Sequence, residues 1–119
     1  AEFYAEVLEL APSNREEDDE NYYLTDGRIT LVLMPWDIQN YAGTGITRSG
    51  PDHFGFKVES IDAFKKDMEA MSDRNPMLTA QPLDKGPEGK ARRELFDRSC
   101  PIGSFQLSDV DGVLIDVSE

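Results

Sequence analysis

The single histidine and one carboxylate near the C-terminus are the residues whose types could do chemistry. His53 is the only histidine among 119 residues, and imidazole serves as an acid–base group, a metal ligand or a structural hydrogen-bonding group. Asp116 stands between Ile115 and Val117 in an apolar run, where a buried carboxylate without a partner is costly. We therefore expect Asp116 to line a cavity, to pair with a cation or to cap a turn.

Other residues that could react with or bind a ligand are less strongly indicated by the sequence. Cys100 has no base near it in the sequence, and a nucleophilic thiol needs an activating partner, so we interpret it as structural. Because it is the only cysteine, it forms no intrachain disulfide, and a reducing cytoplasm is the expected location. Trp36 could line a pocket, and Arg92 and Arg93 could grip an anion, although packing and solvation are the more common roles.

The elements of the first half follow from hydrophobic periodicity and turn chemistry. Residues 1–10 predict a helix with one apolar stripe, and the charged segment 15–20 predicts a solvated loop. Strands are expected over 21–24 and 29–34, joined by a hairpin turn in which Asp26-Gly27 supplies the positive backbone angles.

The second half predicts a strand, a helix, a long loop and a hairpin. Ser60 is a good N-cap for a helix that ends at 73–76. Because of its glycines, prolines and basic residues, the segment 82–93 is expected to be the most mobile loop. The expected strands cover 53–58, 78–81, 104–107 and 113–117.

Side-chain alternation predicts which residues share a face of the sheet. In the strand 53–58, Phe54, Phe56 and Val58 are expected to meet the helix, whereas His53 and Lys57 point to the opposite side. The same alternation places Asp116 on that opposite side of the last strand. His53 and Asp116 are therefore expected to project into one concave groove.

The two halves repeat one pattern. Each has an amphipathic helix followed by a strand, an acidic glycine turn and a strand, and only the second half has a strand before its helix. We therefore expect a further strand before Ala1. The sequence predicts a single α+β domain made of module one (1–36), a linker (37–50) and module two (51–119).

Three segments carry a family resemblance. Two βαβββ modules around a curved mixed sheet are the arrangement of the vicinal oxygen chelate superfamily, which includes glyoxalase I, bleomycin resistance proteins and extradiol dioxygenases. The chain resembles this group in its first helix, in the opening strand of module two and in the ending that follows Gly112. The segments are Phe3–Leu10, Asp52-His53-Phe54-Gly55-Phe56-Lys57-Val58 and Asp109-Val110-Asp111-Gly112-Val113-Leu114-Ile115-Asp116.

The resemblance implies a divalent metal at the mouth of the sheet, held by the first and last strands of each module. His53 matches one ligand position, and Asp116 stands where the family usually has Glu. Leu31 occupies the equivalent place in module one, and leucine cannot bind a metal. Since a catalytic site commonly has three protein ligands, His53 and Asp116 alone predict an incomplete metal site.

Three functions are compatible with these features. The first is a bleomycin-resistance-like domain that binds a small molecule in the groove, and the second is a metal-dependent lyase, isomerase or dioxygenase of the glyoxalase type that uses His53 and Asp116. The third is a structural or regulatory domain with a vestigial groove. The expected ligand-binding residues are His53, Asp116, Leu31, Trp36 and Lys57.

Charge narrows the class of partner. The formal net charge is −12, from 24 acidic and 12 basic residues. Phosphate backbones and anionic membranes bind basic surfaces, so neither nucleic acid nor a membrane is the expected partner. A neutral or cationic small molecule is favoured. A homodimer is also expected, because sheet edges need covering and symmetric dimers are the most common oligomers.

Overall fold

The computed structural model describes residues 1–83, 86–99, 103 and 105–119. The chain divides into two compact units, Ala1–Asp37 (unit 1) and Ile38–Glu119 (unit 2). Both units combine helices with strands, and each has a three-stranded sheet, so the predicted α+β class is confirmed. No helix among the described residues is both long and apolar enough to cross a membrane.

Unit 1 is a short helix followed by an antiparallel sheet. The helix α1 (Glu2–Leu8) ends where Glu9 adopts a left-handed conformation with φ 56°, two residues earlier than the sequence predicted. The strands are β1 (Ala11–Pro12), β2 (Tyr22–Thr25) and β3 (Thr30–Leu33), in the order β1-β2-β3. The strand β1 was not predicted, because the first strand was expected only from residue 21 onward.

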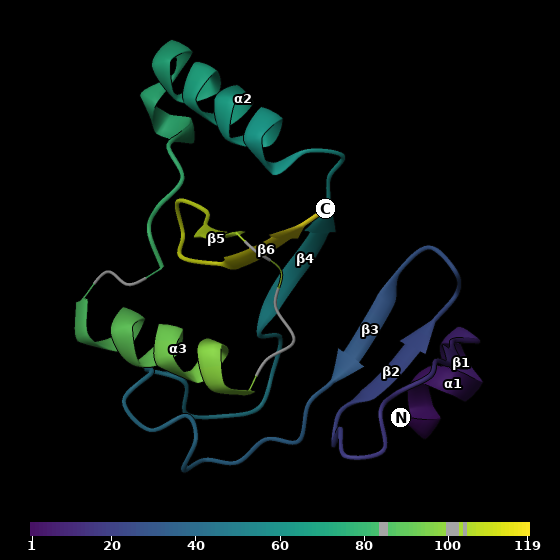
Figure 1. Ribbon diagram of the computed structural model, residues 1–119. Coiled ribbons are helices and arrows are strands. Elements are labelled where there is room, and N and C mark those ends of the chain that lie inside the picture. The colour runs from purple at the N-terminus through teal and green to yellow at the C-terminus, as the bar shows by residue number, and fades with distance from the viewer. Residues whose placement is uncertain (84–85, 100–102, 104) are drawn as a thin grey trace. The chain divides into compact units, whose positions relative to one another are not determined.

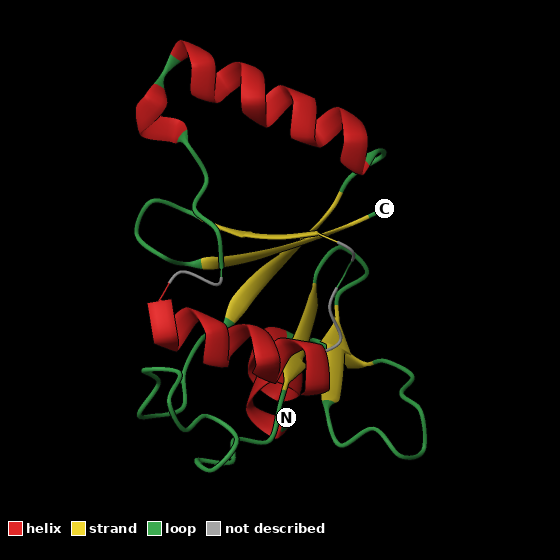
Figure 2. Cartoon of the chain, turned by 60° about the vertical axis from the view of Figure 1, so that its left-hand side comes forward, coloured by secondary structure: helices red, strands yellow, loops and turns green. Residues whose placement is uncertain are grey.

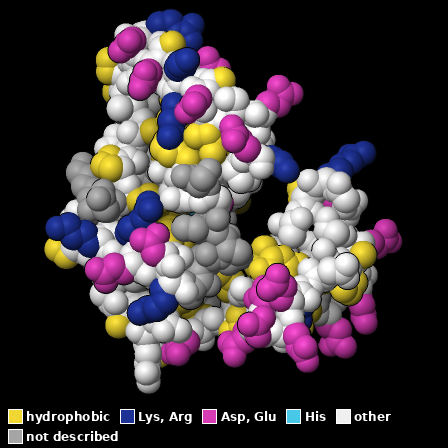
Figure 3. Space-filling model, in the orientation of Figure 1, with side chains coloured by type: hydrophobic (Ala, Val, Ile, Leu, Met, Phe, Trp, Pro, Cys, Tyr) yellow, Lys and Arg dark blue, Asp and Glu magenta, His cyan; other side chains and the backbone are white. Residues whose placement is uncertain are grey.

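The hairpin of unit 1 turns where the sequence predicts, but only Gly27 and not Asp26 has a positive φ. Gly27 has φ 86°, and the Asp26 Oδ1 atom accepts hydrogen bonds from the backbone N–H groups of Arg28 and Ile29. Acidic side chains crowd the visible face of this unit (Figure 3). In segment 15–20 every residue except Asp19 is exposed, in agreement with the predicted solvated loop.

Unit 2 has a mixed sheet with helices on its two sides. Its elements are β4 (His53–Lys57), α2 (Ile61–Arg74), the 3-10 helix η1 (Pro76–Leu78), α3 (Gly86–Ser99), β5 (Phe105–Ser108) and β6 (Leu114–Ser118). The strand order is β4-β6-β5, with β4 parallel and β5 antiparallel to β6. Figures 1 and 2 both show the sheet between α2 and α3.

The core of unit 2 lies between its sheet and α2. Ile61, Leu107 and Val117 are buried together, and Phe64 and Met68 of α2 pack against them. The helix begins as predicted, because the Ser60 Oγ atom accepts a hydrogen bond from the Ala63 N–H group at 3.2 Å. The apolar stripe of α2 therefore packs against the sheet, as its spacing predicts.

Two predicted elements of unit 2 are wrong. The strand expected over 78–81 is reduced to one antiparallel bridge between Gln81 and Ser108, because Pro76–Leu78 form a 3-10 turn instead. The expected loop 82–93 is helical from Gly86 onward. The residue types from Lys90 to Glu94 all have high helix propensity. Pro87 is the second residue of the helix, and proline is tolerated in a first helical turn. Positions 84 and 85 of that expected loop, and position 104 of an expected strand, lie outside the described residues.

The units repeat one topology, apart from the leading strand. In each, the chain runs from a helix to a pairing segment, then to a middle strand and a last strand, and both neighbouring pairs are antiparallel. The strand β4 pairs in parallel with the last strand of unit 2. Segment 38–50 has no helix or strand and falls within unit 2.

Candidate functional site

His53 is held by a carboxylate immediately before its strand. Its Nδ1 atom lies 2.8 Å from Asp52 Oδ2. The other Asp52 oxygen, Oδ1, lies 2.9 Å from Nη2 of Arg92, which also donates to the Asp52 backbone carbonyl at 3.1 Å. All three side chains are mostly buried, with exposed fractions of 12 to 16%. Asp52 thus fixes the orientation of the imidazole and balances the charge of the guanidinium.

The helix α3 closes over this group. Phe96 makes an edge contact with the His53 ring at a centroid distance of 5.1 Å, and Arg92 lies over the same Phe96 ring at 5.4 Å. Arg92 and Phe96 are four residues apart, so they share one face of the helix. The side of the sheet expected to be an open groove is therefore covered by α3 at His53.

Asp116 is hydrogen-bonded to other parts of unit 2 through both of its carboxylate oxygens. Its Oδ2 atom accepts a hydrogen bond from the Gly103 N–H group at 2.7 Å, and its Oδ1 atom accepts one from Gln106 Nε2 at 2.9 Å. Arg93 of α3 donates to the Gln106 side-chain oxygen at 3.2 Å. Asp116 thereby ties the backbone ahead of β5 to β6, and both of its oxygens are occupied.

His53 and Asp116 share a face of the sheet but belong to separate hydrogen-bonded groups. His53 is in register with Leu114, and Asp116 with Gly55. Strand spacing and rise place such diagonal neighbours about 8 Å apart. Lys57, four residues after His53, lies on the same face and is exposed at the end of β4.

The two remaining predicted site residues belong to unit 1. Leu31 is paired with the buried Leu24 in the β2–β3 hairpin, and Trp36 is 38% exposed after β3. The two hairpins differ by one residue in turn length, since Thr25 pairs with Thr30 and Ser108 with Leu114. Counted from these pairs, Val32 rather than Leu31 corresponds to Asp116.

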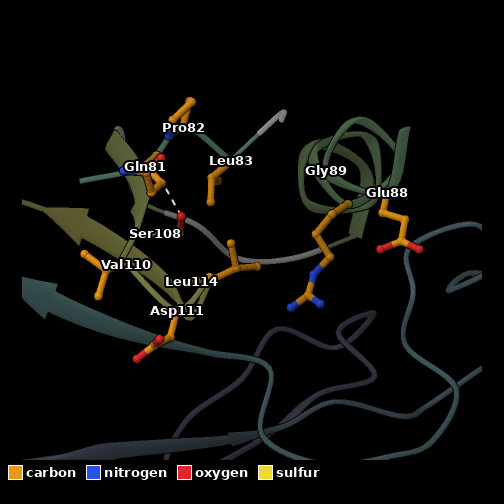
Figure 4. Close-up of a pocket in the computed structure, with 11 residues that line it drawn as sticks. Gln81, Pro82, Leu83, Glu88, Gly89, Ser108, Val110, Asp111 and Leu114 are labelled. Atoms are coloured by element: carbon orange, nitrogen blue, oxygen red, sulfur yellow. Dashed lines mark hydrogen bonds between the residues drawn. The ribbon is translucent and has the colours of Figure 1, made fainter. Parts of the chain in front are cut away.

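A pocket of about 460 Å³ opens in unit 2 between α3 and the β5–β6 turn. Leu114, which is in register with His53, contributes to its wall. Glu88 and Asp111 lie at opposite sides of it (Figure 4). Its lining consists of Gln81, Pro82, Leu83, Glu88, Gly89, Arg92, Ser108, Val110, Asp111, Gly112 and Leu114.

The pocket was missed because one wall was interpreted as a loop. Glu88, Gly89 and Arg92 come from α3, and the sequence signal for that helix was the i, i+4 spacing of its side chains. Arg93 and Asp97 form an ion pair at that spacing, and Leu95 and Phe96 are 3% and 2% exposed. The pocket is acidic in balance, because Asp52 compensates the charge of Arg92.

The residues present do not fit the divalent metal that the resemblance implies. Among the described residues, no group of three His, Cys, Asp or Glu side chains could hold a metal ion. Both oxygens of Asp116 accept hydrogen bonds from the protein.

Comparisons with protein-family models, curated proteins and solved structures each found no significant match. The function of the chain must therefore be argued from the geometry of unit 2 and from the resemblance of its motifs.

Proposed function

We propose that the chain is a glyoxalase- or bleomycin-resistance-like domain protein that binds a small molecule on the His53 face of its unit 2 sheet. The pocket beside α3 is the observation that carries this proposal. Its volume of about 460 Å³ falls in the range of small-molecule sites, and its lining combines apolar and polar side chains.

The lining favours a neutral or cationic ligand. Leu83, Val110 and Leu114 offer apolar contacts, and the exposed residues Glu88 and Asp111 give the lining its acidic charge. Arg92 adds no net positive charge, because Asp52 lies 2.9 Å from its guanidinium. An anionic ligand would meet two uncompensated carboxylates, whereas an amine or a hydroxyl group could donate to them.

The test is a ligand screen by thermal shift. It is followed by calorimetry on the wild type and on two variants in which a glutamate is replaced by the uncharged glutamine. A bound molecule raises the melting temperature by an amount that grows with the logarithm of the ratio of its concentration to its Kd. Glu88→Gln should weaken the binding of an amine by about tenfold, since one charged hydrogen bond is lost. Glu94→Gln is the matched control, because it lies on the same helix, is exposed and is not part of the pocket. Equal effects of the two variants would contradict the proposed site.

A metal-dependent lyase, isomerase or dioxygenase is the second candidate, and one observation favours it. The Nδ1 atom of His53 is fixed by the Asp52 carboxylate, as the second ring nitrogen of a metal-bound histidine commonly is. This candidate needs more ligands than the described residues supply. Titration with Zn²⁺ and Mn²⁺ tests it: stoichiometric binding that His53→Ala abolishes would favour the metal enzyme over the metal-free pocket.

A further inference from the structure

The dipeptide Asp-Gly occurs twice in the chain, once in the hairpin turn of each unit. Asp26-Gly27 lies between β2 and β3, and Asp111-Gly112 lies between β5 and β6. Asp-Gly is the aspartyl sequence that cyclises most readily, because glycine has no side chain to hinder attack by its own backbone nitrogen on the neighbouring carboxyl group. By sequence, the two dipeptides should therefore react alike.

The attacking nitrogens of the two dipeptides are closely matched. Both glycines have φ 86°. The Gly27 N–H group donates to Thr25 Oγ1 at 3.0 Å, and the Gly112 N–H group donates to the Asp109 carbonyl oxygen at 3.1 Å. Each nitrogen must give up one hydrogen bond to react, so the structural difference between the sites lies in their carboxyl groups.

The carboxylate of Asp26 is engaged within its own turn. Its Oδ1 atom accepts hydrogen bonds from the backbone N–H groups of Ile29 at 2.9 Å and Arg28 at 2.8 Å. These bonds hold the pKa of Asp26 below its ordinary value of 3.8, because they favour the charged form. Cyclisation needs the neutral carboxylic acid, since the anion is a poor electrophile without a hydroxyl group to lose. The turn of unit 1 therefore protects Asp26.

In the β5–β6 turn the same role belongs to an aspartate that does not precede glycine. Asp109 Oδ1 accepts from the backbone N–H groups of Asp111 and Val113, at 2.9 Å each. Asp109 is followed by Val110, whose branched side chain hinders attack by its nitrogen. Asp111 is exposed, and no residue in the described part of the chain donates a hydrogen bond to its carboxylate. The longer turn thus separates the aspartate that organises it from the aspartate that can cyclise.

We propose that Asp111 is a site of spontaneous aspartate isomerisation, whereas Asp26 is protected by its turn. The Gly112 nitrogen attacks Cγ of the protonated Asp111 side chain. The N–Cγ bond forms, and the carboxyl hydroxyl group leaves with the amide hydrogen as water. Water then opens the cyclic imide, and opening at the former main-chain carbonyl carbon leaves isoaspartate. Mass is unchanged, and no oxidant or reductant is needed.

The modification alters the wall of the unit 2 pocket. Val110, Asp111 and Gly112 are all part of its lining. In isoaspartate the backbone runs through Cβ and Cγ, so the turn gains a methylene group in its main chain while the free carboxylate is kept. Isomerisation therefore lengthens this wall without changing the number of charges on it.

Ageing of the full chain followed by peptide mapping tests the proposal. Folded protein and protein unfolded in urea are incubated in parallel in a mildly acidic buffer until both sites of the unfolded chain have reacted. Electron-transfer fragmentation of the tryptic peptides distinguishes isoaspartate from aspartate. In the folded chain, isomerisation at Asp111 should be about tenfold faster than at Asp26, since one hydrogen bond to a charged group changes an equilibrium by about that factor. In the unfolded chain the two rates should be similar.

Three results of this comparison overturn the proposal. They are equal rates or a faster reaction at Asp26 in the folded chain, an unmodified Asp111 in the folded chain, and an equal ratio of the two rates in the folded and unfolded chains. The last result would show that the sequence around each dipeptide, and not the turn, sets the difference.

A variant tests the role of the hydrogen bonds within one turn. Val110→Gly, at a side chain that is 61% exposed, creates a second Asp-Gly sequence at Asp109. Because the Asp109 carboxylate accepts two backbone N–H groups, isomerisation there should remain about tenfold slower than at Asp111. Equal rates at the two positions, or a faster reaction at Asp109, overturn the protective role assigned to these hydrogen bonds.

Discussion

Asp116 shows how a single carboxylate can join two strands and the residue that precedes one of them. Its two oxygens accept from Gly103 and Gln106, and Gly103 lies so close to β6 that a Cβ atom there would be 2.6 Å from the Val117 carbonyl oxygen. Only glycine permits this approach. The carboxylate therefore provides an acceptor for a partly buried backbone donor at this close approach.

We predict that Asp116→Ala destabilises the protein by about 1–3 kcal/mol, because two partly buried donors lose their acceptor. Urea denaturation followed by circular dichroism measures the change. Asp97→Ala is the control, since Asp97 forms an exposed i, i+4 ion pair with Arg93 that should contribute under about 1 kcal/mol. An unchanged midpoint for Asp116→Ala would show that the carboxylate does not hold this segment.

Asp26 predicts a pH dependence in unit 1. The backbone N–H groups of Ile29 and Arg28 donate to its carboxylate and hold its pKa below the ordinary value of 3.8. A lowered folded pKa adds stability that is fully present above the unfolded pKa, about 3.9, and is lost as the pH falls through the folded pKa. The stability advantage of the wild type over Asp26→Asn should therefore shrink below about pH 4.

Carboxyl chemical shifts from NMR measure this pKa directly. The Asp26 midpoint should lie below the ordinary value of 3.8, and amide exchange of β2 and β3 reports the local stability. A midpoint at or above that value would contradict the turn geometry.

The sequence indicated which single residues require a hydrogen-bond or ion-pair partner, but it did not indicate which residues those partners are. Asp116, between two apolar neighbours, required a partner, and it has two. That these are Gly103 and Gln106 depends on the β5–β6 register, which local pattern does not determine. The ion pair of Asp52 with Arg92 spans 40 positions and becomes visible only when α3 is placed over β4.

At the scale of elements, a cap or turn was predicted correctly where one residue type fits one backbone geometry. A segment with both helix-breaking and helix-forming residues was not. The Ser60 cap and the Asp26-Gly27 turn each have one residue type suited to one backbone geometry, and both were predicted. In segment 82–93, the glycines and prolines at its start outweighed the helix formers that follow. Tertiary contacts decide in favour of the helix, since Leu95 and Phe96 are buried.

Phe96 is the residue that anchors α3. It is 2% exposed, touches the His53 ring at its edge and supports Arg92. Phe96→Ala should cost about 3–5 kcal/mol, as truncations of buried aromatics do. It should also speed amide exchange throughout α3, because the helix loses its main apolar contact.

Denaturation together with hydrogen exchange checks this prediction. Phe3→Ala is the control, because Phe3 is 64% exposed, and it should change neither the stability of unit 2 nor the exchange of α3. Rapid exchange of α3 in the wild type would instead favour the mobile loop that the sequence predicted for this segment.

At the scale of the whole molecule, the repeat explains why the chain divides as it does. Each unit pairs a helix with its own three-stranded sheet. In unit 1 the last strand β3 has no parallel neighbour among the described residues, whereas the last strand β6 of unit 2 pairs in parallel with β4. A strand ahead of the first helix is therefore seen in unit 2, where the His53 cluster and the pocket also lie.

This division predicts that residues 38–119 fold without unit 1. The core residues Ile61, Leu107 and Val117 all belong to this segment, as do the Asp52–Arg92 ion pair and both partners of Asp116. Its 82 residues exceed the roughly 40 below which a chain usually needs disulfides or metals to fold. The amide NMR spectrum of the isolated segment should overlay that of the full chain for β4, α2, β5 and β6. A collapsed spectrum would mean that unit 1 contributes contacts that unit 2 cannot replace, and that the chain folds as one cooperative body.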